Sequence, residues 1–200
     1  MKIRSASFIK SGTRPAHFPP ADLPEIAFAG RSNVGKSSLM NTLVQRKGLV
    51  KVSGTPGRTQ LLSWFDVNQR LMLCDLPGYG FARVPAHVRR NWGTMIDTYF
   101  ATRANLLALA VLTDVRRGFE DDDRQLIDAA AQLGLHVILV ATKCDRIKPN
   151  ALFNRKAAIA KDMSLDPKRD IIWFSSKTGA GREALWRRID TLLPSVDEAE

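Results

Sequence analysis

Apolar residues fall along the chain in two alternating patterns. Short apolar runs of strand length recur between longer stretches in which apolar positions are spaced three or four residues apart. We expect helices on the longer stretches, near residues 36–46, 86–102, 121–133, 150–162 and 181–193. We expect strands on the short runs, near residues 25–29, 61–67, 70–75, 105–113, 136–142 and 170–174. Strands that alternate with helices are typical of an α/β fold, in which helices cover both faces of a mainly parallel sheet.

One connection in this pattern cannot join parallel strands. Only Asn68 and Gln69 separate the strands expected at 61–67 and 70–75, and such a short link forces an antiparallel hairpin. The prediction is therefore a six-stranded sheet that is mostly parallel, with one antiparallel strand. Ligands of such sheets bind at the carboxyl ends of the strands, so we expect the functional residues in the loops that follow them.

The chain reads as one domain with a short extension at each end. Residues 1–24 contain four prolines and predict an extended arm packed on the domain, with room for a short strand near Ala6 to Lys10. Residues 25–195 form the domain itself, and a chain of 200 residues can bury one sizeable core. Residues 196–200 form an acidic tail that we expect to be frayed.

A phosphate-binding loop follows the first strand of the domain. The pattern is G-x-x-x-x-G-K-S, and its residues are Gly30, Arg31, Ser32, Asn33, Val34, Gly35, Lys36 and Ser37. The two glycines let the backbone wrap a phosphate chain with its amides pointing inward. In this pattern the lysine reaches the β- and γ-phosphates and the serine hydroxyl ligates Mg²⁺. The helix expected from residue 36 places its N-terminus under the phosphates.

Two later motifs indicate that the nucleotide carries guanine. The first is Thr142-Lys143-Cys144-Asp145, which follows an apolar strand. An aspartate there can accept both the N1–H and the exocyclic amine of guanine, whereas adenine would leave the carboxylate partly unpaired. We expect the Lys143 stem to pack over the base. The second motif, Ser175-Ser176-Lys177, is similar to an S-A-K element whose backbone N–H meets the guanine O6.

Between these motifs lie candidates for sensing the γ-phosphate. Asp75-Leu76-Pro77-Gly78 is a D-x-x-G motif after a strand. We expect Asp75 to hold Mg²⁺ through water and the Gly78 N–H to bond the γ-phosphate. The polar segment 54–60 supplies two threonines, Thr55 and Thr59, as candidates for the second side-chain Mg²⁺ ligand, and we favour Thr59.

These motifs, in this order, resemble the EngB family of bacterial ribosome-assembly GTPases, within the translation-factor class of P-loop GTPases. The resemblance covers roughly residues 5–195 and rests on six segments, at 30–38, 55–60, 75–82, 113–118, 142–145 and 175–179. It implies a Ras-like fold and GTP hydrolysis, with Lys36, Thr59 and Gly78 at the reacting phosphate. It also implies that Thr59 is a Mg²⁺ ligand and that the nucleotide is lined by Gly57, Arg58, Thr59, Gln60 and Leu61. The family further implies a role in maturing the large ribosomal subunit, with an associated effect on cell division and septation.

One position departs from the Ras pattern. In Ras-like proteins a glutamine after the D-x-x-G glycine orients the attacking water, and here that residue is Tyr79. We therefore expect slow intrinsic hydrolysis that a partner or a cation stimulates. Asn33 allows two interpretations: its side-chain oxygen binds K⁺ beside the phosphates, or it only caps and stabilises the loop.

Charge indicates the kind of partner. Thirty Lys and Arg against twenty Asp and Glu give a net charge of +10, which favours an anionic partner, and RNA fits best. We expect the large ribosomal subunit or its precursor, and no DNA. The basic residues that we considered are Arg83, Arg89, Arg90, Arg103, Arg116, Arg117, Arg155, Lys156, Arg187 and Arg188, with Trp92, Trp173 and Trp186 interleaved.

Composition limits the cellular setting. The longest apolar run, Leu106 to Leu112, is far shorter than the roughly 20 residues that span a bilayer, and Met1 to Ser5 lacks the apolar core of a signal peptide. We therefore expect a cytoplasmic monomer that binds no membrane, with Cys74 and Cys144 as reduced thiols.

Two functions of different classes remain open. The chain is either a GTP-hydrolysing switch that acts on a ribosomal precursor, or an RNA-binding assembly module in which the nucleotide is mainly a structural ligand. A nucleotide kinase is disfavoured because it would leave the two guanine motifs unexplained.

Overall fold

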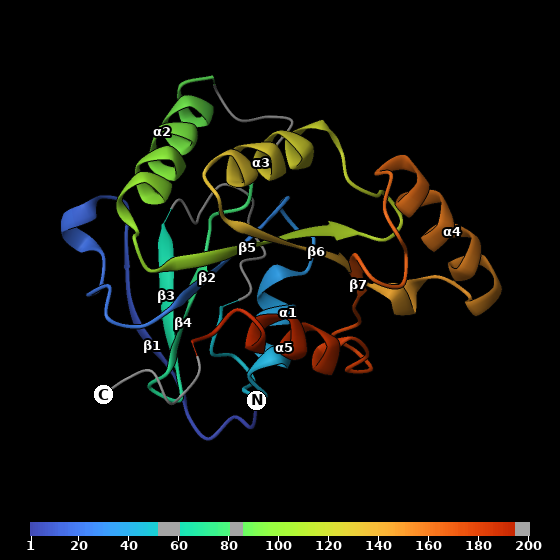
Figure 1. Cartoon of the computed structure of the whole chain (residues 1–200), viewed down its shortest axis with the longest axis horizontal. Helices are drawn as coiled ribbons and strands as arrows, with labels where there is room; N and C mark the ends of the chain where they lie inside the picture. Colours follow the sequence, from blue (N-terminus) through green and yellow to red (C-terminus); the bar gives the residue numbers. More distant parts are fainter. Residues whose placement is uncertain (52–60, 81–85, 195–200) are drawn as a thin grey trace.

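The computed structural model describes residues 1–51, 61–80 and 86–194. Its centre is a seven-stranded sheet with the strand order β1-β3-β4-β2-β5-β6-β7 (Figure 1). The strands are β1 (Ala6–Gly12), β2 (Glu25–Gly30), β3 (Leu62–Val67), β4 (Leu71–Asp75), β5 (Leu106–Asp114), β6 (His136–Thr142) and β7 (Ile171–Trp173). The helices are α1 (Lys36–Leu43), α2 (Ala86–Thr102), α3 (Asp121–Gln132), α4 (Pro149–Asp162) and α5 (Arg182–Asp190).

The sheet is parallel except at β3, which confirms the predicted fold class. β2 pairs in parallel with β4 and β5, and β6 pairs in parallel with β5 and β7. β3 is antiparallel to β4, as the two-residue link required, and Asn68 and Gln69 in that link both have positive φ. Positive φ at both central positions suits the right-handed twist of a hairpin.

The sheet has one strand more than the predicted six. The additional strand is β1 (Ala6–Gly12), which lies where a short strand was expected in the N-terminal arm, near Ala6 to Lys10. It joins the sheet by pairing antiparallel with β3, from Ala6 opposite Val67 to Gly12 opposite Leu62. Most of its side chains are exposed or half-buried, so it contributes backbone hydrogen bonds more than core. β1 forms one edge of the sheet, and β7 forms the other.

Helices cover both faces of the sheet, and each face has its own apolar core. On one face, Tyr99 of α2, Leu126 of α3 and Ile159 of α4 join the inward side chains of the strands. On the other face, Leu39 of α1 and Trp186 of α5 do the same. Figure 1 shows α2 and α3 on one side of the sheet and α1 and α5 on the other. Every residue of β2 is buried, which is expected of a central parallel strand.

A buried ion pair fixes the N-terminal arm to this core. The carboxylate of Glu25 is fully buried, and it accepts hydrogen bonds from Trp64, Tyr99 and Arg103. Arg103 also donates to the carbonyl of Pro19 at 2.7 Å, so the pair reaches from the start of β2 into the arm. This corrects the expectation that Arg103 belongs to a basic surface, because the residue is 6% exposed.

The predicted boundaries agree closely with the structure, with a few differences. α1 and α5 end three residues before the expected positions 46 and 193. Short 3₁₀ turns at Pro15–His17 and Cys144–Arg146 were not predicted. Trp186, considered as part of a basic aromatic surface, lies in the core. In the three described segments, no helix combines the length and apolarity needed to cross a bilayer.

Candidate nucleotide-binding site

The phosphate loop connects β2 to α1 and is held from both sides. Val34 is buried in the core, and its carbonyl oxygen lies 2.6 Å from the Thr142 hydroxyl at the end of β6. Gly35 has φ +104°, in the left-handed region that favours glycine, and it precedes the first residue of α1. The loop therefore turns sharply into the N-terminus of α1, and a helix N-terminus favours an anion such as a phosphate.

Two groups expected to act on the phosphates meet in this loop. The Lys36 ammonium, on the first residue of α1, forms an ion pair with the Asp75 carboxylate at the end of β4. Both side chains are largely buried, at 11% and 14% exposed. The neighbouring Ser37 is half-buried at the same helix start. The Ser37 hydroxyl and the Asp75 carboxylate are oxygen donors, the type that Mg²⁺ requires, so these residues fit a magnesium ion.

The D-x-x-G turn lies directly against the phosphate loop. Ser32 N donates to Tyr79 O at 3.0 Å, and Tyr79 N donates to Gly30 O at 3.4 Å. A side chain at Gly78 would place its Cβ 2.9 Å from the Ser32 hydroxyl oxygen. That hydroxyl is buried and has no hydrogen-bond partner among the described residues. The close approach thus requires glycine at position 78 and leaves a polar group of the loop for a ligand.

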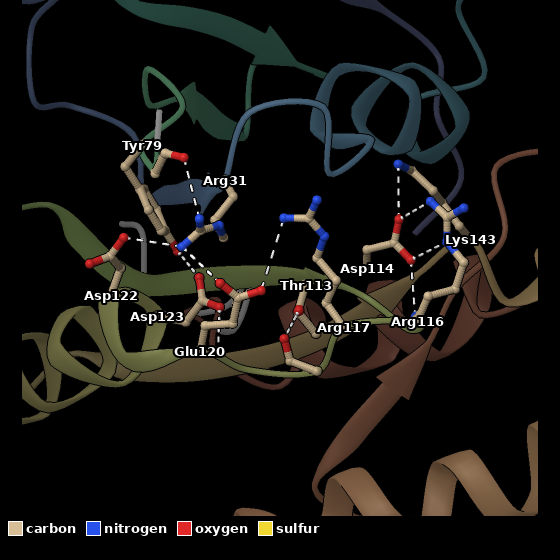
Figure 2. A network of polar contacts seen from close by, with 12 residues as sticks. Arg31, Tyr79, Thr113, Asp114, Arg116, Arg117, Glu120, Asp122, Asp123 and Lys143 are labelled. Atoms are coloured by element: carbon tan, nitrogen blue, oxygen red, sulfur yellow. Dashed lines mark hydrogen bonds and ion pairs between the residues drawn. The ribbon is translucent and has the colours of Figure 1, made fainter. Parts of the chain in front are cut away.

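Tyr79 points away from the loop and into α3 (Figure 2). Its hydroxyl donates to the Asp123 carboxylate at 2.5 Å, its ring packs edge-on against Trp92 at 5.4 Å, and only 8% of the residue is exposed. Burial, together with the Asp123 charge, raises the pKa of Tyr79 far above its usual range. Burial also raises the pKa of Asp123. The phenol is therefore neutral and is already engaged with α3.

Arg31 connects the phosphate loop to the same helix. Its guanidinium lies 3.1 Å from both Glu120 and Asp122 at the start of α3, and it donates to Gly80 O at 3.3 Å (Figure 2). Asp123 and Glu120 form a reciprocal capping box that starts the helix. The start of α3 thus binds both Arg31 of the phosphate loop and Tyr79, which follows the D-x-x-G motif. Sequence reasoning missed these side-chain partners.

The two guanine motifs are brought together at the ends of β6 and β7. Ser175 Oγ donates to Asp145 Oδ1 at 2.7 Å, which holds the carboxylate that would bind the base. Cys144 N donates to Phe174 O at 3.1 Å and links the two loops through the backbone. Ser176 is half-buried beside Ser175, and Lys177 is exposed.

Lys143 joins the base motif to the phosphate loop. It has φ +59°, and its ammonium lies 2.5 Å from Asn33 O and 3.1 Å from Asp114 Oδ2. Burial opposes the ionisation of Asp114, but hydrogen bonds from Arg116 and Lys143 outweigh it and hold the pKa of Asp114 below its usual range. Asp114 and Arg116 lie within the segment 113–118 that carried the family resemblance, yet their contacts were not predicted.

The structure thus gathers most of the predicted residues at the carboxyl ends of the strands. They lie at or just after the ends of four strands: Gly30 to Ser37 at β2, Asp75 to Gly78 at β4, Thr142 to Asp145 at β6 and Ser175 to Lys177 at β7. Leu61 is exposed just before β3. The predictions for Gly57, Arg58, Thr59 and Gln60, and for the alternative Thr55, lie outside the described residues. The cysteines Cys74 and Cys144 are buried and free.

Comparison with known proteins agrees with this geometry. Residues 25–143 match the family described as "50S ribosome-binding GTPase". The "Probable GTP-binding protein EngB" of Geobacter metallireducens is 48% identical over 198 residues, which cover 99% of this chain and 97% of that protein. Its counterpart in Syntrophotalea carbinolica is 49% identical over 200 residues, covering 99% of this chain and 95% of the relative.

Solved structures share the fold at lower sequence identity. The crystal structure of a probable GTP-binding protein engB has a TM-score of 0.68 at 24% identity, covering 84% of this chain and 97% of that one. Era in complex with MgGDPNP and nucleotides 1506–1542 of 16S ribosomal RNA has a TM-score of 0.63 at 22% identity, covering 86% of this chain and 57% of Era. The full-length relatives and the matched domain together show that this chain belongs to the EngB family of GTP-binding proteins, within the P-loop GTPases.

Proposed function

We propose that the protein is a GTP-hydrolysing switch that assists assembly of the large ribosomal subunit, with an associated role in cell division and septation. The observation that carries the proposal is the direct bonding between the phosphate loop and the D-x-x-G turn, through Ser32 N to Tyr79 O and Tyr79 N to Gly30 O. A γ-phosphate in the loop must meet the turn that starts at Asp75. This bonding supports a turn that responds to whether GTP or GDP is bound.

The proposed chemistry uses residues that the fold brings together, and in addition Thr59, which lies outside the described residues. Backbone amides at the end of the loop, from Gly35 to Ser37, bind the phosphates. Lys36 adds a positive charge at the β- and γ-phosphates, and the Gly78 N–H bonds the γ-phosphate. Ser37, Thr59 and, through water, Asp75 would hold Mg²⁺, which when bound neutralises charge on the phosphate oxygens. Asp145 reads guanine, and Ser175 fixes its carboxylate.

The rate of hydrolysis should be low without an activator. A residue that orients the attacking water must reach the γ-phosphate, and the Tyr79 hydroxyl is instead committed to Asp123. We propose that the ribosome or a cation raises the rate. K⁺ held by the Asn33 side chain would add charge where it develops in the transition state.

The potassium proposal can be separated from a purely structural role of Asn33. Asn33 has φ +63°, so Asn33→Gly keeps the loop conformation and removes the side-chain oxygen, whereas Asn33→Asp keeps an oxygen. With K⁺ binding, KCl stimulates hydrolysis over NaCl in the parent and in Asn33→Asp but not in Asn33→Gly. Equal rates of the parent in both salts would overturn the proposal and leave loop stabilisation as the role.

The partner side of the proposal rests on family and charge. The matched family is described as ribosome-binding, and the net charge of +10 suits ribosomal RNA. We propose a cytoplasmic monomer that binds the large subunit or its precursor and neither DNA nor membrane. The test is cosedimentation of the purified protein with large subunits in GDP and in a non-hydrolysable GTP analogue. Preferential binding with the analogue supports the switch, and no binding in either state would overturn the ribosomal role.

A second function is favoured by one specific observation. Because Tyr79 is engaged by α3, hydrolysis could be incidental, and the protein would then act as an RNA-binding assembly module with nucleotide as a structural ligand. This alternative requires equal affinity for large subunits in the GDP and GTP-analogue states. The same cosedimentation therefore distinguishes the two functions.

A further inference from the structure

A basic groove lies on the edge of the sheet that β7 forms. It has a volume of about 490 Å³ and is bounded by α4, the loop before β7, β7 itself and α5. Figure 1 shows β7 at the end of the sheet, with α4 and α5 on either side of it. None of the described residues that line it belongs to the phosphate loop, the D-x-x-G turn or the two guanine motifs. The groove is therefore separate from the candidate nucleotide site.

Five cationic side chains from three different elements line this groove. They are Lys156 of α4, Lys168 and Arg169 of the loop before β7, and Arg187 and Arg188 of α5. Like charges gathered in one hollow repel each other, so such a cluster costs stability unless an anion is bound. The gathering cannot be read from the sequence spacing, because 32 positions separate the first of these residues from the last.

Carboxylates neutralise little of this charge. In the three described segments, one of the five cations forms an ion pair: Arg169 Nε lies 3.2 Å from Asp170 Oδ1. Among the described residues, Lys156, Lys168, Arg187 and Arg188 form no ion pair with a carboxylate within 4.0 Å. Arg188 instead donates to the carbonyl of Arg169 at 2.7 Å, which holds the guanidinium at the groove. Within the part of the chain that the structure describes, these four cations therefore lack a carboxylate partner at ion-pair distance and can meet an anionic ligand.

An aromatic side chain lies among these charges. Trp173 of β7 is half-buried, and its indole N–H donates to Pro167 O at 2.6 Å, which fixes the ring. The Lys156 ammonium lies 5.3 Å from the ring centroid. Proteins that bind single-stranded nucleic acid combine a fixed aromatic ring with nearby Lys and Arg. The cations contact the phosphates, and the bases lie near the ring.

We propose that this groove binds the phosphate backbone of an RNA strand, and so forms an RNA contact made by residues outside the nucleotide motifs. The inference rests on the proposed function, since it names the surface through which the protein would hold a ribosomal precursor. RNA fits better than a peptide added to the sheet edge, because β7 offers only three residues for a backbone ladder. Arginine guanidinium groups can donate two hydrogen bonds to one phosphate, and lysine ammonium groups attract phosphates as point charges.

The test is a pair of charge reversals that change net charge equally. Lys168→Glu with Arg187→Glu alters two exposed groove residues whose side chains make no hydrogen bond among the described residues. Arg14→Glu with Arg70→Glu is the control, because both residues are exposed and lie near the opposite edge of the sheet. GTP-analogue affinity, measured first, should be unchanged in both variants and confirms that they fold.

The binding probes are purified large ribosomal subunits and a fluorescein-labelled single-stranded RNA 20-mer. We expect the groove variant to lose at least about tenfold in affinity for both probes, and the control variant less than about threefold. The dependence of log affinity on log salt concentration should fall by about 1.4 for the 20-mer, since roughly 0.7 is expected per phosphate contact on a single strand.

Each other outcome has a distinct meaning. If the parent fails to bind large subunits in any nucleotide state, the proposed ribosomal function is wrong, and the RNA 20-mer still tests the groove. If the parent binds and both variants lose affinity equally, the groove proposal is overturned and general charge explains the binding. If a fluorescein-labelled polyglutamate 20-mer binds the groove as tightly as the RNA, the partner is an acidic protein segment and the RNA proposal is overturned.

Discussion

At the scale of single residues, two buried carboxylates depend on arginine partners. Glu25 and Asp114 are each held by an arginine, but Arg103 is buried whereas Arg116 is exposed, so the cost of losing the partner differs. Glu25 is fully buried with Arg103 beside it. Asp114 is also buried, but its partners Arg116 and Lys143 are more exposed than Arg103.

Removing Arg103 should be severely destabilising. Arg103→Met leaves the Glu25 carboxylate buried, with only the Trp64 and Tyr99 donors, and breaking a buried pair in this way costs about 3–5 kcal/mol. Urea unfolding of the parent and the variant measures the difference. Arg70→Met, at an exposed turn, serves as the control and should change stability by less than about 0.5 kcal/mol. A loss below about 1 kcal/mol for Arg103→Met would contradict the role of the pair.

Asp114 should make stability depend on acid pH. Its pKa is lower in the folded protein than the value of about 3.9 in an unfolded chain, so its contribution is fully present above that pH. The contribution is lost as pH falls below about 4 towards the folded-state pKa. Unfolding free energies measured from pH 6 to pH 3 should therefore fall less steeply for Asp114→Asn than for the parent. Identical slopes would show that Asp114 is not held in its charged form.

At the scale of helices, strands and loops, one junction ties the nucleotide site to the start of α3. The phosphate loop, the D-x-x-G turn and the start of α3 are joined by short contacts through Ser32, Arg31 and Tyr79. Contacts of this kind link a change at the phosphates to the position of a helix. Two substitutions test separate parts of this junction.

Gly78→Ala should weaken nucleotide binding by crowding the phosphate loop. The new Cβ would lie 2.9 Å from Ser32 Oγ and 3.3 Å from Ser32 Cα, so the loop must shift. We expect the affinity for a GTP analogue to fall by about tenfold or more, measured by isothermal titration calorimetry, because the loop amides are displaced from the phosphates. Gly93→Ala is the matched control, since no atom lies within 4 Å of its new Cβ and alanine favours a helix. Equal affinities in the two variants would contradict the crowding.

Tyr79→Phe should change stability but not hydrolysis. The variant loses the hydrogen bond to Asp123, and bonds to charged groups contribute about 1.5–3 kcal/mol. The intrinsic GTPase rate, measured by phosphate release, should stay within about twofold, because the hydroxyl does not face the phosphate loop. A fall of tenfold or more in that rate, with GTP affinity intact, would place the hydroxyl in the reaction.

The sequence predicts elements better than it predicts their side-chain partners. The two-residue link at Asn68 and Gln69 determined the antiparallel strand because its length allows no other connection. A short strand was expected near Ala6 to Lys10, but its place in the sheet was not, since its side chains are mostly exposed and its pairing with β3 relies on the backbone. Asp123 was missed because several acidic residues open α3, and any of them could simply favour a helix N-terminus.

At the scale of the whole molecule, the nucleotide motifs and the basic groove lie at two different places on the sheet. The carboxyl ends of β2, β4, β6 and β7 carry the nucleotide motifs, and the outer edge along β7 carries the basic groove. The net charge of +10 favours an anionic partner. The sequence alone could not predict which basic residues lack a carboxylate partner and so remain available to that anion. Arg103 and Arg116 show why, because carboxylates neutralise both of these candidates within the fold.

The most direct test of the account asks whether subunit binding depends on the nucleotide. Purified protein would be sedimented with large ribosomal subunits in GDP and in a non-hydrolysable GTP analogue, at matched salt and protein concentration. The account predicts at least about tenfold tighter binding in the analogue, since in the proposed switch a γ-phosphate would contact the turn that starts at Asp75. Equal binding in the two states would contradict the switch and favour the RNA-binding module.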